Sequence, residues 1–362
     1  MEDIMKRLGN LYEQIIDYEN LWEAYLNARK GKRFRGEVLE FSNNLEENLI
    51  QIQNELIYKT YEIGRYREFH VYEPKKRLIM SLPFKDRVVQ WAIYKVLEPY
   101  FDRQFISDSF ACRKGKGSQQ AASRVQYWIR KVERTGARPY HLKCDVSKYF
   151  YRIDHQVLLS MLQRKIKDDD LMWLLEKIIC SEDVNFGVPL MDHQFEEDRI
   201  EGMGMPIGNL TSQLFANLYL NELDQFVKHK LKIKYYARYM DDMVIIDNDK
   251  QNLNAILEDM DLFLRFDLKL LLNNKTAIRP TSDGVDFVGF RIWSTHKKLK
   301  KKTVKKMKKR LKYLQKAYAR GEVELEHIKP TIASYLGLMK HADCHKLKTK
   351  LLNDFVLTRG AH

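Results

Sequence analysis

The spacing of hydrophobic positions changes several times along the chain, and the changes predict a protein of helices and β-strands. Up to about residue 60, apolar side chains recur at helical spacing, which predicts an N-terminal helical region. Residues 67–72 and 74–80 are strand-like and enclose a basic loop, so they predict a hairpin. A helix rich in apolar residues is predicted from Asp86, and another follows the basic, glycine-containing turn at 110–118.

Two apolar runs enclose residues 239–242, whose sequence is Tyr-Met-Asp-Asp. The runs at 233–238 and 243–246 contain aromatic and β-branched residues, which predicts two strands joined by a very tight turn. Aspartate is common in turns, because its side chain accepts local backbone hydrogen bonds. Apolar strands, however, would hold Asp241 and Asp242 in a partly desolvated place, where like charges raise each other's pKa unless a cation neutralises them. The segment therefore indicates a metal site.

A third carboxylate supports this interpretation. Residues 141–145 alternate between polar and apolar, as a half-buried strand does, and they end on Asp145. A carboxylate at a strand end, facing a hairpin that carries two aspartates, is what a two-metal phosphoryl-transfer site requires. Mg²⁺ prefers oxygen ligands and needs few from the protein, since substrate phosphates supply others.

A second informative segment lies at 204–213, where two glycines and a proline predict a tight loop. Apolar residues from Leu214 to Val227 fall on one helical face, so a helix follows the loop. A glycine-bearing loop that opens a helix suits close approach to a base pair or a phosphate.

The C-terminal third contains short apolar segments at 271–275 and 285–292, and then a strongly basic run. In the run from Lys297 to Arg310, apolar residues recur at helical spacing, which predicts one helix with a basic face. The acidic segment 181–199 has no clear period and is expected to be an exposed loop; no function is assigned to it.

Composition narrows the range of possible binding partners. The 362 residues are enough for two or three subdomains, and 44% hydrophobic content supports a core. A formal charge of +14 suits a polyanionic partner, since phosphate neutralisation releases counterions, although charge alone does not separate nucleic acid from an anionic membrane. There is no long apolar run or leader-like N-terminus, and the four cysteines are scattered, which together predict a cytoplasmic protein.

The set formed by Asp145 and residues 239–242 resembles the catalytic carboxylates of reverse transcriptases. The resemblance implies an α+β right-hand polymerase with fingers, a palm of antiparallel sheet plus helices, and a helical thumb. It also implies that Asp145 and Asp241 are the main ligands of two Mg²⁺ ions, for which Mn²⁺ can substitute, while Asp242 has a less direct role. The expected division is an N-terminal helical extension (1–60), fingers (61–135), palm (136–294) and thumb (295–362).

The resemblance further implies residues that bind the incoming dNTP. Arg77, with Lys75 as a weaker candidate, would contact the triphosphate, which suits the planar guanidinium fork. Phe150 falls where the family has an aromatic ring that excludes a 2′-OH, and ordinary core packing is the alternative. Lys275 stands where such polymerases have a lysine that protonates the leaving pyrophosphate, and a plain surface lysine is the alternative.

Nucleic-acid contacts are implied at three more places. Arg113 and Lys114, in the basic turn, would lie near the template. Residues 287–291 resemble the primer-grip hairpin, in which Gly289 allows the backbone to approach the primer. Lys301 and Lys305 belong to the basic helix, which resembles a thumb helix that follows a duplex backbone.

The 204–213 loop narrows the resemblance. Most reverse transcriptases have Gln where Ile207 stands, and Ile207 with Gly208 and the Ser212-Gln213 pair resembles reverse transcriptases of diversity-generating retroelements. These enzymes, of bacteria or phages, copy a template-repeat RNA into cDNA with errors opposite adenine, usually with a small basic accessory protein. Gln can check the geometry of the nascent pair by a hydrogen bond, whereas Ile offers only packing, so Ile207 is expected to lower fidelity. Gly208 and Gln213 are expected to bind dNTP.

Three alternatives remain open. The chain could be a reverse transcriptase of a retron, a group II intron or a defence system. It could be an inactive polymerase fold that binds RNA. Ile207 could also simply pack beneath its loop.

Overall fold

The computed structural model describes residues 7–72, 77–180, 185–188 and 199–359. Its contacts divide the chain into two units, each built from several segments. Unit 1 comprises Met1–Ser107, Val146–Leu231 and Asp259–Asn273; unit 2 comprises Asp108–Asp145, Lys232–Glu258 and Asn274–His362. The predicted four-part division into extension, fingers, palm and thumb stays a prediction.

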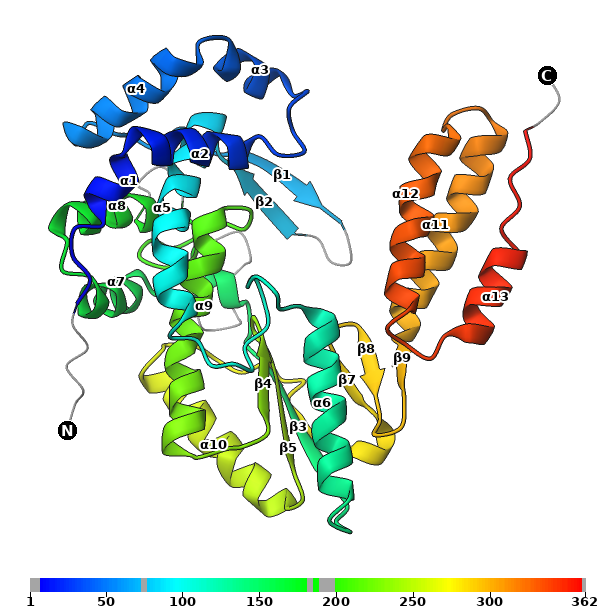
Figure 1. The fold of residues 1–362 in the computed structure, drawn as a ribbon. Helices are drawn as coiled ribbons and strands as arrows, with labels where there is room; N and C mark the ends of the chain where they lie inside the picture. Colours follow the sequence, from blue (N-terminus) through cyan, green and yellow to red (C-terminus); the bar gives the residue numbers. More distant parts are fainter. Residues whose placement is uncertain (1–6, 73–76, 181–184, 189–198, 360–362) are drawn as a thin grey trace. The chain divides into compact units, whose positions relative to one another are not determined.

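Unit 1 begins with the predicted N-terminal helices, drawn in blue in Figure 1: α1 (Tyr12–Ile16), α2 (Tyr18–Ala28), α3 (Gly36–Asn43) and α4 (Leu45–Ile57). Asp17 caps α2 by accepting from the Asn20 backbone N–H at 3.1 Å. The buried side of α2 packs on α5 (Phe84–Asp102), where Tyr25 meets Phe84 edge-on. The N-terminal helices thus share the hydrophobic core of unit 1.

The remaining elements of unit 1 are a hairpin and further helices. They are β1 (Arg67–Val71), β2 (Arg77–Ser81), the 3₁₀ helix η1 (Tyr149–Tyr151), α7 (His155–Lys165), α8 (Asp169–Ile179), α9 (Leu210–Gln225) and the π-helical η2 (Phe226–Lys230). The two strands pair antiparallel, so the predicted hairpin is confirmed. Helix α9 is buried along most of its length and packs against α5. Most of the predicted acidic loop, 181–199, lies outside the described residues.

The core of unit 2 is a four-stranded antiparallel sheet with strand order β4-β5-β3-β6. Its strands are β3 (Tyr140–Asp145), β4 (Tyr236–Tyr239), β5 (Asp242–Asp247) and β6 (Ala277–Pro280). Figure 1 shows α6 (Ser118–Glu133) beside this sheet, and Val125, Trp128 and Ile129 of α6 join a buried cluster with residues of β4 and β5. Helix α10 (Lys250–Phe266) begins in unit 2 and ends in unit 1.

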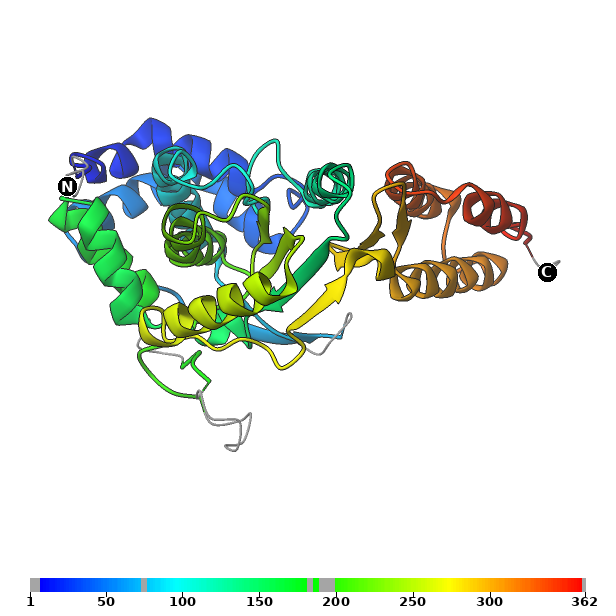
Figure 2. The same cartoon turned by 90° about the horizontal axis from the view of Figure 1, so that it is seen from below.

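The C-terminal part of unit 2 consists of a small sheet, yellow-gold in Figure 1, and three helices, orange to red in Figures 1 and 2. The elements are β7 (Val285–Phe287), β8 (Phe290–Ile292), β9 (Lys297–Leu299), α11 (Lys301–Ala319), α12 (Leu325–Met339) and α13 (His345–Asn353), with the 3₁₀ helix η3 (Thr281–Asp283) before β7. Within the part of the chain that the structure describes, no helix is long and apolar enough to cross a membrane.

Two details differ from the sequence-based expectation. The basic run from Lys297 does not begin as a helix: residues 297–299 form β9, and α11 begins at Lys301. Strand β9 pairs with β8, which satisfies backbone groups at that edge, and it buries Leu299. Strand β6 was not predicted; it lies at a sheet edge, where Pro280 is tolerated.

Candidate active site

The predicted tight turn of unit 2 is confirmed by strand register. Strands β4 and β5 pair so that Tyr239 lies opposite Asp242, which leaves Met240 and Asp241 as a two-residue loop. Met240, the first loop residue, has a backbone φ of 56°, the left-handed region that non-glycine residues rarely adopt. The loop therefore reverses the chain within two residues and displays Asp241 at its tip.

The same register brings the third aspartate to the turn. Strand β3 pairs with β5 on the side away from β4, and Asp145 lies opposite Asp242. Directly opposed residues of an antiparallel pair have Cβ atoms about 4.5–5.5 Å apart. All three aspartates are half-buried. Two carboxylates are thus opposed across the sheet, and a third precedes one of them in the chain.

A lysine that the sequence analysis did not single out lies at these carboxylates. Lys143 is two residues before Asp145 on β3, so both side chains are on the same face. Its ammonium group forms an ion pair with Asp242 and lies 5.5 Å from the centre of the Phe287 ring. Burial lowers the pKa of Lys143 to about 8, against the opposing effect of Asp145. The polar-apolar alternation of β3 could have indicated this shared face.

Whether these residues fit a metal is a question of donor chemistry and charge. Carboxylate oxygens are the ligands that Mg²⁺ prefers. Lys143 shows that the face accommodates a cation beside Asp242. Among the described residues, however, no three Asp, Glu, His or Cys side chains already form a group that could hold a metal ion. The donor set fits a divalent cation, which Asp145, Asp241 and Asp242 would hold.

In unit 1, the loop at 204–209 joins two candidate nucleotide-binding elements by backbone hydrogen bonds. The Met205 N–H donates to the carbonyl of Phe150 in η1 at 2.7 Å, and the Met80 N–H of β2 donates to the carbonyl of Ile207 at 3.1 Å. The side chains of Phe150 and Ile207 are both half-buried. The predicted steric-gate and fidelity positions are therefore linked through one loop within unit 1.

Gly208 is needed for both conformation and space. Its φ is 129°, and a Cβ there would be 3.0 Å from the Met80 carbonyl oxygen and 3.3 Å from Ile79 Cγ2. The next residue, Asn209, is buried and donates from Nδ2 to the Tyr66 hydroxyl at 3.0 Å. Sequence reasoning missed Asn209, whose partner is 143 residues away. The loop is held against β2 and the segment before β1.

The structure describes the other candidates for dNTP binding in unit 1 only in part. Gln213 lies in the first turn of α9 and is half-buried. Arg77 begins β2 opposite Val71, but its side chain is outside the described structure, as is all of Lys75. Their predicted contacts with a triphosphate stay predictions.

The remaining candidates are all in unit 2. Arg113 is half-buried, and its Nη1 donates to the Ser109 carbonyl at 3.0 Å, whereas Lys114 is exposed. Lys275 is exposed in the turn before β6. Gly289 turns the β7–β8 hairpin with a φ of 89°, and a Cβ there would meet no atom within 4 Å, so glycine is required by conformation alone.

The basic face of α11 is observed as predicted from Lys301 onward. Lys301 and Lys305 are exposed, while the buried face carries Met307, Leu311, Leu314 and Ala317. Their contact with a duplex stays a prediction.

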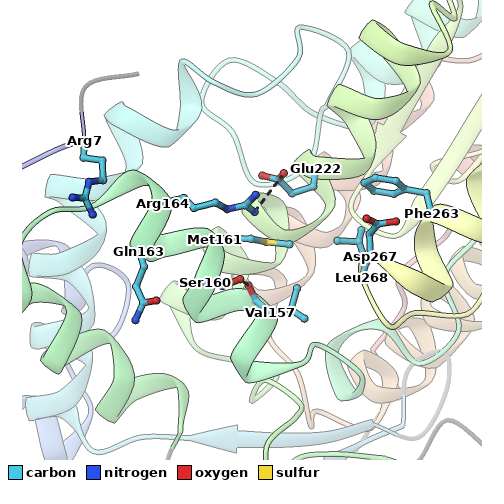
Figure 3. A pocket seen from close by; sticks show the side chains of 10 residues that line it. All are labelled: Arg7, Val157, Ser160, Met161, Gln163, Arg164, Glu222, Phe263, Asp267 and Leu268. Carbon is cyan, nitrogen blue, oxygen red and sulfur yellow. Dashed lines mark hydrogen bonds and ion pairs between the residues drawn. The ribbon is translucent and has the colours of Figure 1, made fainter. Parts of the chain in front are cut away.

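A separate hollow of about 830 Å³ opens in unit 1, between α7, α9 and the end of α10. Arg164 and Glu222 both line it and form an ion pair at 3.7 Å. Figure 3 shows this pair, with Met161, Phe263 and Leu268 among the apolar lining. Of the residues that the structure describes, none of the candidate catalytic or nucleotide-binding positions lines this hollow. It is therefore not assigned to the reaction.

Comparison with known proteins identifies a family. Residues 72–292 match the family described as reverse transcriptase (RNA-dependent DNA polymerase). Protein YkfC of Escherichia coli (strain K12) is 28% identical over 259 residues, which cover 61% of this chain and 65% of YkfC. The group II intron-encoded protein LtrA of Lactococcus lactis subsp. cremoris is 24% identical over 360 residues, which cover 80% of this chain and 58% of LtrA. Among solved structures, apo telomerase from Candida tropicalis, truncated from its C-terminal domain, matches 66% of this chain and 55% of its own with a TM-score of 0.47 and 13% identity.

The antiparallel sheet with helices, and the carboxylates at its hairpin, define a right-hand nucleic-acid polymerase, so the predicted α+β fold class is confirmed. The family match covers more than half of the chain, which therefore belongs to the reverse transcriptase family. The chain spans less than two thirds of the length of YkfC and of LtrA.

Proposed function

We propose that this chain is an RNA-directed DNA polymerase whose reaction is carried by Asp145, Asp241 and Asp242. The observation that supports this most directly is the register that opposes Asp145 to Asp242 and leaves Asp241 in a two-residue loop. Asp145 and Asp241 hold two Mg²⁺ ions, and Asp242 completes the negative set. The chemistry that such ions supply when bound is stabilisation of the attacking and leaving oxygens of an in-line displacement.

Residues of unit 1 bind the incoming nucleotide. Phe150 lies against the sugar and excludes a 2′-OH, and Ile207, Gly208 and Gln213 pack near the new base pair. The hydrogen bonds of the 204–209 loop to η1 and β2 support this assignment, since they fix the loop backbone at Met205 and at Ile207. Arg77 and Lys75 bind the triphosphate, and Lys275 protonates the leaving pyrophosphate.

Unit 2 carries the contacts to nucleic acid. Arg113 and Lys114 contact the template RNA, and Gly289 lets the β7–β8 hairpin approach the primer. Lys301 and Lys305 neutralise phosphates of the RNA/DNA duplex, which the exposed lysine face of α11 supports.

The finer proposal is error-prone copying of a template-repeat RNA, as in diversity-generating retroelements, with a small basic accessory protein as partner. Ile207 supports it, because this side chain carries no hydrogen-bonding group with which to test the nascent pair. The loop backbone is anchored at Ile207 itself, so the position is well defined even though the side chain offers only packing.

A reverse transcriptase of the group II intron type is the second candidate. It is favoured by the similarity to LtrA, which extends over 80% of this chain. The two candidates share the chemistry and differ in fidelity. Error frequency at template adenines therefore separates them, whereas overall activity does not.

The test is primer extension on a defined RNA template with Mg²⁺ and four dNTPs, with every product sequenced. The wild-type chain is expected to make cDNA, and Asp241→Asn is expected to lower the rate by at least about a thousandfold while RNA binding stays within twofold, because one oxygen ligand is lost but no phosphate contact. A variant that extends at the wild-type rate would refute the catalytic assignment. Errors concentrated at adenines support the retroelement candidate, and faithful cDNA supports the intron-type candidate.

A further inference from the structure

Arg238 is the next-to-last residue of β4, two residues before the loop residue Met240, and its side chain is completely buried, at 0% exposure. Its Nη1 donates a hydrogen bond to the carbonyl oxygen of Met240 at 3.1 Å. A guanidinium group stays protonated at any physiological pH, so this is a charge-assisted bond inside the protein. A buried cation is thus directed at the backbone of the catalytic loop.

The backbone of Arg238 is itself held on the edge of β4 that faces away from β5. Its N–H donates to the carbonyl of Asp108 at 3.0 Å, and its carbonyl accepts from the N–H of Phe110 at 3.0 Å. The carboxylate of Asp108 accepts in turn from Nε of Arg124 on α6 at 2.9 Å. The backbone of Arg238 is therefore fixed to the 108–110 segment, and its side chain extends to the loop from a fixed backbone position.

The hydrogen bond acts on a specific peptide group. Because a peptide is planar, fixing the carbonyl oxygen of Met240 also fixes the direction of the Asp241 N–H. Met240 adopts the left-handed conformation that a side chain with a Cβ disfavours, so the loop would relax without a restraint. The Arg238 bond supplies such a restraint and so limits the directions in which the Asp241 side chain can point.

We propose that Arg238 is a positioning residue, which holds Met240 in its left-handed conformation and thereby presents the Asp241 carboxylate for metal binding. The inference rests on the proposed role of Asp241. It predicts that the requirement for Arg238 depends on how readily residue 240 adopts positive φ. Asparagine adopts this conformation more readily than methionine does.

The test uses the full-length chain and four variants: Arg238→Lys, Met240→Asn, the double variant and Arg152→Lys. Arg152 is the matched control, since it is another fully buried arginine, at 1% exposure, that lies in unit 1. Mn²⁺ binding is measured by electron paramagnetic resonance, independently of activity. Steady-state kinetics then give kcat, KM for dNTP and the Mg²⁺ concentration for half-maximal rate, all corrected for the fraction of active enzyme.

Arg238→Lys is expected to weaken Mn²⁺ binding at least fivefold and to raise the half-maximal Mg²⁺ concentration by the same factor. It is also expected to lower kcat at least tenfold and to leave KM for dNTP within twofold of the wild-type value. Adding Met240→Asn is expected to recover at least half of the lost Mn²⁺ affinity. Arg152→Lys is expected to reduce thermal stability and to leave Mn²⁺ binding within twofold. The proposal would be overturned if Arg238→Lys left Mn²⁺ binding unchanged. It would also be overturned if the change in Mn²⁺ affinity of the double variant equalled the product of the changes in the two single variants.

Two further results distinguish failure of the positioning role from misfolding of the variant and from failure of the proposed function. If Arg238→Lys does not fold, restored folding in the double variant supports the proposal, and its absence overturns it. Asp241→Asn, measured in parallel, tests the proposed role of Asp241: retention of Mn²⁺ binding and activity there would refute that role. Loss of both in Asp241→Asn, with both retained in Arg238→Lys, would refute only the positioning role.

Discussion

Replacing Gly208 by alanine tests whether the 204–209 loop must lie against β2. Glycine at 208 has a φ of 129°, and an added Cβ would be 3.0 Å from the Met80 carbonyl oxygen, which is backbone and cannot rotate away. The neighbouring residues are already tied, since the Met80 N–H donates to the Ile207 carbonyl at 3.1 Å. The substitution therefore either strains residue 208 or moves the loop away from β2.

The magnitude follows from two contributions. A non-glycine residue in such a conformation costs about 1–3 kcal/mol. Overlap in a packed environment costs about 1–3 kcal/mol more, part of which is relieved if the loop withdraws and gives up its hydrogen bond, itself worth about 1 kcal/mol. The expected loss is about 2–4 kcal/mol, which corresponds to roughly 3–5 °C in Tm for a chain of 362 residues. Withdrawal would displace Ile207 and is expected to raise KM for dNTP about tenfold.

The matched control is Gly321→Ala. Gly321 has a φ of 70°, and a Cβ there would meet no atom within 4 Å, so alanine adds conformational strain of about 1–2 kcal/mol without overlap. Thermal unfolding gives the stability of both variants, and single-nucleotide incorporation gives KM. Equal Tm losses in the two variants, together with an unchanged KM in Gly208→Ala, would refute the reasoning that the loop is wedged against β2.

Two other predictions concern fidelity and pH. Ile207→Gln is expected to lower misincorporation opposite template adenine severalfold, because a side-chain amide can hydrogen-bond near the nascent pair; an unchanged error spectrum by product sequencing would contradict this. Burial lowers the pKa of His141 from 6.5 to about 4, so the unfolded chain binds more protons between these values and stability falls as pH drops through this range. Chemical denaturation should show that His141 lowers the free energy of unfolding by about 2 kcal/mol between pH 7 and pH 5. His141→Gln should remove this part of the pH dependence, and an equally steep pH dependence in the variant would contradict the assignment.

The elements that were predicted correctly are those that local sequence patterns determine. The β4–β5 hairpin was predicted because aromatic and β-branched runs lie on either side of four residues, and a turn that short leaves little choice of register. The polar-apolar alternation of residues 141–145 predicted strand β3 with Asp145 at its end, but not the register that places Asp145 opposite Asp242. The buried face of α11 was predicted from helical spacing in the same way.

What the sequence did not predict depends on pairing between distant segments. Strand β9 carries two lysines and a leucine, a pattern without a strand signal, and it forms because β8 offers an unpaired edge. Strand β6 likewise pairs with β3, which is more than a hundred residues earlier in the chain. The bond from Asn209 to Tyr66 and the reach of Arg238 to Met240 are set by tertiary packing, and no local pattern announces them.

The two cations near the β4–β5 turn illustrate why the carboxylates alone do not define the proposed site. Asp145 and Asp242 are opposed on neighbouring strands and Asp241 is next to Asp242, so their like charges repel and the fold must offset this repulsion before any metal binds. Lys143 does so on the sheet face, where its ammonium pairs with Asp242. Arg238 acts on the backbone instead, through the Met240 carbonyl. One cation therefore balances charge and the other fixes direction, and a sequence search for acidic motifs detects neither.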